Sequence, residues 1–355
     1  MKSFDYRILK DKEWDNEILS YVAKIHEYKG KQELYIEQKH VELDRLVKIA
    51  KIQSTESSNR IEGIITTNAR LKKIMDNKTT PRNRDEKEII GYRNVLNIIH
   101  ENYKYIYLTP NYILQLHKEL LKYTSFSYGG QFKTTRNEIT KSLFDGTREV
   151  VFNPLSPYET PDAISNICQQ YKNVISFIDP LILIPYFILD FLCIHPFNDG
   201  NGRMSRLLTL LLLYKNGYMV GKYISIEKAI ADTKENYYDA LEISCQNWHK
   251  DKNNPKEFIK YMLSIILYCY RDFKNRTEFV RESKTKITSY DIVKRYIMNK
   301  IGSFTKREVL YKSPSLSSSS VEASLKKLVS EGIVKRIGSG KNTRYLRSID
   351  NSPDF

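Results

Sequence analysis

The twelve residues HPFNDGNGRMSR (195–206) interrupt two of the most apolar stretches of the chain, LILIPYFILDFLCI (181–194) and LLTLLLLY (207–214). The flanking stretches are typical of buried helices, and the glycines between them favour a turn where one helix ends and the next begins. A histidine, an acid, two glycines and two arginines therefore lie where the chain otherwise builds core. We interpret this loop as the first candidate for a functional site.

The bulk composition indicates a mostly helical protein. The chain has 355 residues, of which 41% are hydrophobic, with only 14 Gly and 11 Pro, which suits roughly two or three modest domains. No CxxC or Cys/His ligand spacing is found among Cys168, Cys193, Cys245 and Cys269, which favours a reducing compartment. The N-terminus lacks a signal-peptide pattern, and the longest apolar run is too short to span a bilayer. We expect a cytoplasmic protein with no membrane partner.

Three segments follow one another along the chain. Residues 1–83 are predicted to form an N-terminal helical region, and residues 84–276 a second, longer run of helices that forms the core. Within the second run, residues 129–161 mix β-branched residues with several Gly and Pro, which predicts a hairpin or flap. Residues 285–350 predict three helices followed by a hairpin, the order of a winged helix-turn-helix domain. The predicted fold class is therefore mainly α, with a β-hairpin flap and a small C-terminal winged helix-turn-helix.

The C-terminal segment holds much of the positive charge. Of the net charge of +15, the residues from Lys284 onward carry 15 Lys and Arg against 6 Asp and Glu, a net +9. Such an asymmetry predicts an anionic partner, and a solvated basic surface is the alternative. DNA is one such partner, although the serine-rich third helix offers few of the side chains that read bases. Docking of the target protein or formation of a homodimer stays open. The basic residues of the third helix and the hairpin are Lys326, Lys327, Lys335, Arg336, Lys341, Arg344 and Arg347.

The glycine-containing part of the loop predicts a binding site for phosphate. Gly200, Asn201 and Gly202 lie where the second apolar helix begins, and the first turn of a helix has unpaired N–H groups with partial positive charge. Glycines let an anion approach this backbone closely. Arg203 and Arg206 fall on one face of the helix and can reach the same anion. Together these features indicate a multiply charged phosphate chain.

The acid and the histidine of the loop complete the chemistry. Asp199 would repel phosphates unless a cation bridges them, and a carboxylate beside phosphates is the usual ligand for Mg²⁺. His195 is the one base of the cluster that titrates near neutral pH, which suits proton removal from a nucleophile. Phe197 is expected to anchor the loop in the core. The combination predicts phosphoryl or nucleotidyl transfer rather than metal-dependent hydrolysis.

The loop matches every specified position of the HxFx(D/E)GNGRxxR signature, and residues 55–275 resemble the Fic family. Fic enzymes typically transfer AMP from Mg·ATP to a Ser, Thr or Tyr hydroxyl of a target protein, so the resemblance implies a protein adenylyltransferase with a Fic-type helical core. It implies that His195 is the base and Asp199 the Mg²⁺ ligand. The nucleotide-binding residues that it implies are Asp199, Gly200, Asn201, Gly202, Arg203, Met204, Ser205 and Arg206, with the arginines balancing the outer phosphates.

Two further segments are similar to parts of Fic proteins. The flap sequence QFKTTRNEIT lies where these proteins clamp the nucleotide and align the target backbone by strand addition. Tyr237 and Tyr238 resemble the wall beside the adenine, and an aromatic core position on a helix is the alternative. The flap residues that the resemblance singles out are Asn137, Glu138, Ile139 and Thr140.

The segment SNRIEG (58–63) fits the inhibitory pattern (S/T)xxxE(G/N) of the Fic subclass with an N-terminal inhibitory helix. The resemblance implies that Glu62, together with Ser58, pairs with Arg206 and so competes with the γ-phosphate of ATP. The alternative is an ordinary helix end at Gly63, with Glu62 as an exposed acid that has no inhibitory role.

Several functions stay open from the sequence. Self-modification, removal of AMP from a target, and transfer of another nucleotide or phospho-group use the same residues. A DNA-binding transcriptional regulator whose Fic-like body senses nucleotide is the alternative from a different functional class.

Overall fold

The computed structural model of the chain describes residues 2–38, 40–142, 147–282, 288–298, 303–313, 316–340 and 343–348. The chain divides into two compact units, Met1–Lys274 and Asn275–Phe355. The predicted mainly helical fold class is confirmed, because helices dominate and the strands of the described residues form two short antiparallel hairpins. Among these residues, no helix combines the length and the apolar character needed to cross a membrane.

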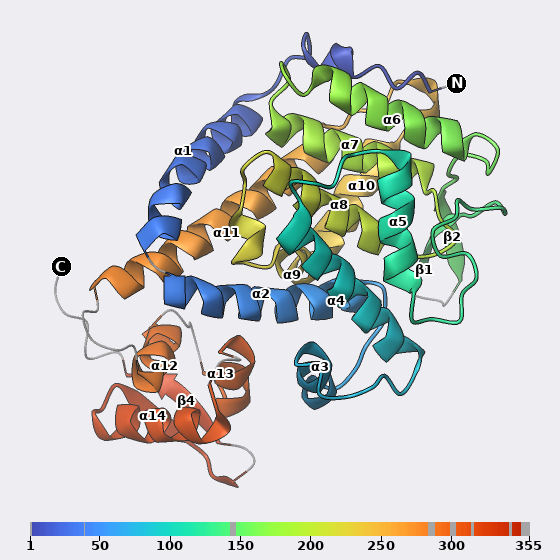
Figure 1. Cartoon of the computed structure of the whole chain (residues 1–355). Coiled ribbons are helices and arrows are strands. Elements are labelled where there is room, and N and C mark those ends of the chain that lie inside the picture. Colours follow the sequence, from blue (N-terminus) through green and yellow to red (C-terminus); the bar gives the residue numbers. More distant parts are fainter. Residues whose placement is uncertain are drawn as a thin grey trace. The chain divides into compact units, whose positions relative to one another are not determined.

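The first unit is a helical body with one hairpin (Figure 1). Its helices are α1 (Asn16–Gln38), α2 (His40–Ile61), α3 (Asn68–Met75), α4 (Arg84–Asn102), α5 (Pro110–Leu121), α6 (Thr160–Val174), α7 (Pro180–Ile194), α8 (Asn201–Lys215), α9 (Ile226–Asp232), α10 (Lys234–Cys245) and α11 (Lys256–Glu282). Short 3-10 turns lie at Tyr6–Leu9, Val220–Lys222 and Trp248–Lys250, and the strands are β1 (Ile139–Ser142) and β2 (Arg148–Phe152).

Helices α7 and α8 form the centre of this body (Figure 1). Every residue of α7 from Leu181 to Ile194 is buried, which explains why its sequence is apolar on all sides. The helix begins with Pro180, whose missing N–H is no loss in a first turn, and the Asp179 carboxylate accepts from Leu181 N at 2.8 Å. The stretch LLTLLLLY (207–214) of α8 is apolar for the same reason. The loop that joins the two helices is therefore held between two buried elements.

Helix α2 is part of the same compact unit as the helices that follow it. The buried Ser54 Oγ donates to Glu227 Oε2 of α9 at 2.7 Å, and Tyr92 of α4 donates to the other oxygen of Glu227 at 2.9 Å. A buried carboxylate needs such donors, so these bonds tie three helices together. The predicted boundary at residue 83 therefore does not separate two compact units. The predicted stop at Gly63 is confirmed, since α2 ends at Ile61 and Gly63 has a φ of 80°.

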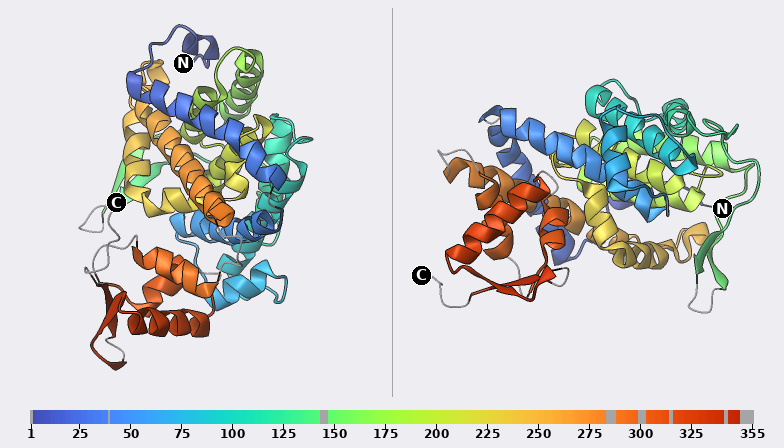
Figure 2. Two further views of the ribbon diagram at one scale, coloured as in Figure 1. Left: turned by 90° about the vertical axis from the view of Figure 1, so that its left-hand side faces the viewer. Right: turned by 90° about the horizontal axis from the view of Figure 1, so that it is seen from below.

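The predicted flap hairpin is confirmed at β1 and β2. The strands pair antiparallel with Thr140 opposite Val150 and Lys141 opposite Glu149. Figure 2 shows the hairpin projecting from the edge of the helical body. Within the part of the chain that the structure describes, β1 pairs with β2 alone, which leaves its other edge unpaired.

The second unit has its own small core. Its elements are α12 (Ser289–Met298), α13 (Lys306–Lys312), α14 (Ser318–Ser330), β3 (Val334–Ile337) and β4 (Arg344–Arg347). Three helices followed by an antiparallel hairpin match the order expected from the sequence. Ser317 caps α14 by accepting from Ser320 N at 3.1 Å, and the helix stops before Gly332 with its φ of 74°. Lys341, predicted on the hairpin, lies outside the described residues.

Candidate active site

The loop between α7 and α8 is fixed by the side chain of Asn201. Its Oδ1 accepts from Phe197 N at 2.9 Å, and its Nδ2 donates to Phe197 O at 2.8 Å. Phe197 is buried, as expected, and stacks on His117 with 3.7 Å between ring centroids. Both ends of the Asn201 amide are thus engaged in holding the loop, and its backbone N–H at the start of α8 suits the predicted phosphate contact.

His195 is placed and protonated as a base requires. It follows the last residue of α7 in a left-handed conformation, φ 51°, and its ring Nδ1 lies 3.3 Å from Leu192 O. Because a carbonyl can only accept, Nδ1 carries the proton of the neutral ring and Nε2 keeps its lone pair. Burial lowers the pKa of His195 to about 4, so the imidazole is neutral at pH 7. The ring can therefore accept a proton at Nε2.

The residues of the flap segment that precede strand β1 also support the loop. Lys133 is buried, and its Nζ donates to Ile194 O at 3.0 Å and to Asn137 Oδ1 at 2.8 Å. The amide of Asn137 in turn donates to His195 O at 3.3 Å and to Phe197 O at 3.1 Å. Burial lowers the pKa of Lys133 to about 8. Asn137, which the resemblance places in the flap, thus lies at the loop, and neither its contact with the loop nor that of Lys133 was predicted.

The remaining flap residues lie farther along the hairpin. Glu138 and Thr140 are exposed and Ile139 is half-buried. Ile139 and Thr140 belong to β1, and the pairing with β2 is irregular between them. The structure therefore separates Asn137, which holds the loop, from the three residues after it, which form the edge of the flap.

His117 is a second support that sequence reasoning missed. Its Nε2 lies 3.0 Å from Asp199 O, and its Nδ1 accepts from Gly130 N at 3.1 Å. Burial lowers the pKa of His117 to about 4, so the ring is neutral and Nε2 carries the proton. Its sequence neighbours at helical spacing, Ile113, Leu120 and Leu121, are apolar core residues, so periodicity alone would have placed His117 in the core.

The two arginines of α8 turn toward different helices. Arg203 is buried and forms ion pairs with Glu88 of α4, 2.7 Å from Nη1, and with Asp199, 3.3 Å from Nη2. Arg206 is buried against α2, where Nε donates to Ser58 Oγ at 2.8 Å and Nη2 to Ser58 O at 2.9 Å. Residues three apart on a helix differ by about 60° in direction, which is enough to face two neighbours. In this structure the two arginines therefore contact different neighbours, and their meeting at one anion stays a prediction.

Glu62 lies directly on the first turn of α8. Its Oε1 accepts from Arg206 Nη2 at 2.7 Å. A Cβ built on Gly202 would overlap the Glu62 carboxylate, so only glycine leaves room for the acid at this point of the backbone. Burial alone would lower the pKa of Arg206, but the charge of Glu62 raises it well above its usual value. The structure thus brings together Ser58, Glu62 and Arg206, the three residues named for inhibition.

Asp199 is half-buried at the same helix end. Its Oδ1 accepts from Gly200 N at 2.6 Å, and its Oδ2 lies 3.8 Å from Arg84 Nη2. Within the described ranges, no group of three or more His, Cys, Asp and Glu residues could hold a metal ion. A single carboxylate beside phosphates nevertheless suits Mg²⁺, which keeps several waters and takes its other ligands from substrate. The donor set therefore fits a cation that arrives with a nucleotide rather than a resident metal.

Four predicted nucleotide contacts differ in their exposure. Tyr237 is buried against Phe258 and Tyr261, which is the core alternative, whereas Tyr238 is 42% exposed. Met204 and Ser205, predicted as nucleotide contacts, are buried as well, and Ser205 Oγ donates to Gly202 O at 2.7 Å. The reason is that α8 is packed on all sides, so these side chains point into the body. Of these four residues, only Tyr238 has a side chain that is exposed to solvent.

Comparisons with known proteins match the region that contains the loop between α7 and α8. Residues 107–213 match the Fic/DOC family. Over 212 residues the chain is 26% identical to a protein named Protein adenylyltransferase Fic from Culex quinquefasciatus, a match that covers 57% of this chain and 38% of the relative. Over 84 residues it is 36% identical to a Probable protein adenylyltransferase of Aquifex aeolicus, covering 24% of this chain and 26% of the relative. The chain thus matches less than half the length of these curated relatives.

Solved structures share the fold. A Fic family protein from Desulfovibrio desulfuricans superposes with a TM-score of 0.63 at 19% identity, covering 96% of this chain and 99% of that chain. A Fic domain containing signaling protein from Bacteroides thetaiotaomicron gives 0.61 at 23% identity, covering 74% of this chain and all of that one. The chain thus matches the Fic/DOC family over residues 107–213 and shares its fold with solved structures of Fic proteins.

Proposed function

We propose that the protein is an auto-inhibited protein adenylyltransferase, which moves AMP from Mg·ATP to a Ser, Thr or Tyr hydroxyl of a target protein. The observation that carries the proposal is the Glu62 carboxylate, which lies against Gly202 and Arg206 at the start of α8. An acid from the turn after α2 at this place indicates that the first turn of α8 accepts an anion. The names of the curated relatives support the same reaction.

The reaction needs a proton acceptor beside the incoming hydroxyl. His195 Nε2 takes the proton while the hydroxyl oxygen attacks the α-phosphorus of ATP. A bond forms between this oxygen and the phosphorus, the bond from the α-phosphorus to the bridging oxygen breaks, and pyrophosphate leaves with the electron pair. The neutral state of His195, which burial favours by lowering its pKa to about 4, keeps the base ready at pH 7.

The nucleotide would lie along the start of α8. The backbone N–H groups of Asn201 and Gly202 would hold phosphate oxygens, and Arg206 would balance the outermost phosphate. Asp199 would bind Mg²⁺, which supplies charge neutralisation on the phosphates when it is bound. Arg203, which lies 3.3 Å from Asp199 Oδ1, is better placed to orient this carboxylate than to reach the γ-phosphate itself.

Inhibition follows from the position of Glu62. Its carboxylate forms a charge-assisted hydrogen bond with Arg206 and lies on the backbone that the phosphates need. ATP then loses the arginine that orders its outer phosphates, and the α-phosphorus is not aligned for in-line attack. The carboxylate is 32% exposed, so it can leave without unfolding the body. Removal of Glu62 should therefore release the activity.

The flap offers a place for the target. The unpaired edge of β1 can accept an extended segment by main-chain hydrogen bonds, as in other cases of strand addition. Asn137, just before β1, also donates to His195 O, so the strand and the base are joined through one side chain. A hydroxyl on a bound segment would thereby be brought near the loop.

The proposal is tested by mass spectrometry on Glu62→Gly mixed with ATP, Mg²⁺ and cell lysate. We expect a mass gain matching AMP on a protein of the lysate or on the enzyme itself. The double variant Glu62→Gly/His195→Ala should give no gain. A Glu62→Gly protein that binds ATP yet modifies no protein would contradict the proposal. If the wild-type protein then removes the label, the same site also carries the reverse reaction.

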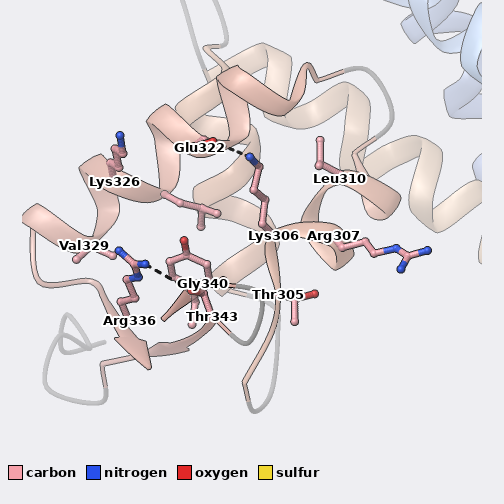
Figure 3. Close-up of a pocket in the computed structure, with 12 residues that line it drawn as sticks. Thr305, Lys306, Arg307, Leu310, Glu322, Lys326, Val329, Arg336, Gly340 and Thr343 are labelled. Carbon is pink, nitrogen blue, oxygen red and sulfur yellow. Dashed lines mark hydrogen bonds and ion pairs between the residues drawn. The ribbon is translucent and has the colours of Figure 1, made fainter. Parts of the chain in front are cut away.

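A second function concerns the C-terminal unit, for which we propose DNA binding by a winged helix-turn-helix. A pocket of about 620 Å³ lies between α13, α14 and the hairpin, as Figure 3 shows. The basic side chains that line it are Lys306, Arg307, Lys326 and Arg336, and the acid among them, Glu322, is paired with Lys306 at 2.7 Å. This excess of positive charge favours a polyanion.

Binding to duplex DNA in a gel shift at two salt concentrations tests this second function. Affinity for DNA should fall steeply with salt. The double variant Lys326→Ala/Arg336→Ala should reduce the slope of log K against log salt concentration by about 2. Unchanged DNA mobility at low salt would contradict DNA binding. The partner of this surface would then be the target protein or a second copy of this chain. Gel filtration of the protein alone distinguishes the two, because only the second gives a dimer.

A further inference from the structure

Two cysteines from distant parts of the sequence meet beside the active site. Cys193, the second-last residue of α7, and Cys245, the last residue of α10, are free thiols whose Sγ atoms lie 3.0 Å apart. The spacing of the cysteines in the sequence does not predict this contact, because the two residues are separated by 52 positions. A covalent S–S bond is about 2.05 Å long, so the two sulfurs need to approach by only about 1 Å.

The two thiols differ in access. Cys193 is fully buried, and burial raises the pKa of its thiol well above the usual value. Cys245 is half-buried, so a small oxidant can reach it. This pairing of an accessible thiol with a buried one in contact is typical of a site where a first oxidation is followed by disulfide formation.

We propose that Cys193 and Cys245 are a redox modification site, at which a peroxide forms a disulfide between the ends of α7 and α10. The Cys245 thiolate attacks one oxygen of hydrogen peroxide, the O–O bond breaks, and Cys245 becomes a sulfenic acid as hydroxide leaves. The Cys193 sulfur then attacks the sulfenic sulfur, the S–O bond breaks, and water forms with the proton of the Cys193 thiol. In total two thiols and one peroxide give one disulfide and two waters.

The bond would join elements that carry parts of the site. His195 follows Cys193 by two residues at the end of α7. At the other end of α10, Lys234 Nζ donates to Ile61 O at 2.8 Å, next to Glu62. The disulfide would therefore fix α10 between the base and the end of α2. We expect slower hydrogen–deuterium exchange along α10 in the oxidised protein, a consequence that does not depend on the proposed AMP transfer.

The test is thiol counting and peptide mapping of the full chain before and after hydrogen peroxide. Two of the four cysteines should lose their thiols, and a tryptic digest without reductant should contain one peptide pair joined through Cys193 and Cys245. The Tm should rise by on the order of 5 °C and return after reduction. This readout is chemical, so its result does not depend on whether the protein transfers AMP.

Matched variants identify the pair. Cys168→Ser, which removes a buried thiol on α6, should form the cross-link as the wild type does, whereas Cys245→Ser should not. Oxidation of Cys245 to a sulfenic or sulfinic acid without a cross-link would overturn the proposal. So would retention of all four thiols under conditions in which peroxide oxidises the same protein in guanidinium chloride.

Discussion

Two segments face the first turn of α8, and they are held very differently. The loop from His195 to Gly200 is fixed on several sides by Asn201, Asn137, Lys133 and His117. The backbone of the turn that carries Glu62 is held by Asn59 O and by Lys234, but its carboxylate is one-third exposed and pairs with Arg206. The difference is the one that the proposed function needs, a preorganised loop for catalysis and an acid that can leave the anion site.

The largest effect is expected from the base. His195→Ala in the Glu62→Gly background should lower AMP transfer by about 10³-fold, since general-base catalysis contributes roughly 10²–10⁴-fold. ATP binding should remain, because the loop is held by Asn201 rather than by the imidazole. His26→Ala is the control, as this exposed histidine pairs with Asp179 away from the loop. Equal AMP transfer by the His195→Ala and His26→Ala proteins would show that His195 takes no part in the reaction.

Loss of the acid is expected to give the next largest effect. Glu62→Gln keeps the shape but removes the charge, and should raise AMP transfer about 10- to 100-fold, the range that corresponds to a charged hydrogen bond of about 1.5–3 kcal/mol. Glu56→Gln is the matched control, since Glu56 lies on α2 with similar exposure and pairs with Arg60. Radiolabel transfer from ATP measures both. If the two variants behave alike, Glu62 does not occupy the site.

The supports of the loop should matter less than the base itself. Lys133→Met removes the donor to Ile194 O and Asn137 Oδ1, so His195 is held less firmly. We expect kcat for AMP transfer in the Glu62→Gly background to fall about 10-fold while KM for ATP changes little. Lys122→Met, which removes an exposed partner of Glu119, is the control. A rise in KM with constant kcat would show that Lys133 acts on the nucleotide instead.

The smallest effect concerns stability and pH. Burial lowers the pKa of His117 and His195 to about 4 and of His100 to about 3, below the ordinary value of 6.5. Between pH 4 and 6.5 the unfolded chain therefore binds more protons, so stability falls as the pH falls through this window. The Tm should drop by on the order of 5 °C from pH 7 to pH 5.

A variant separates the histidines from the carboxylates in this pH dependence. His117→Gln should flatten the change in Tm between pH 7 and pH 5. Paired acids such as Glu86, whose pKa is lowered to about 2 chiefly by the hydrogen bond from Arg70, affect stability only below about pH 4.5. An unchanged slope in the His117→Gln protein would mean that this ring does not contribute.

The local features of the site could be predicted from the sequence. Apolar helices on both sides of the loop, the glycine at the end of α2 and the hairpin of the flap all follow from periodicity and from Gly and Pro positions. The meeting of Glu62 with Arg206 was implied by a resemblance, because a short pattern alone cannot show which helices touch.

The remaining features depend on how helices pack. The direction of Arg203 toward Glu88 requires α4 to lie beside α8, and His117 reaches Asp199 only because α5 packs beneath the loop. Cys193 and Cys245 meet through the packing of α7 on α10. Such contacts join residues far apart in the chain, and a single sequence carries no local signal for them.

The most direct test of the central claim compares ATP labelled at the α-phosphate with ATP labelled at the γ-phosphate. The account predicts that Glu62→Gly transfers only the α-label to protein, that wild type transfers far less, and that His195→Ala transfers none. Transfer of the γ-label, or equal α-labelling by wild type and Glu62→Gly, would contradict it.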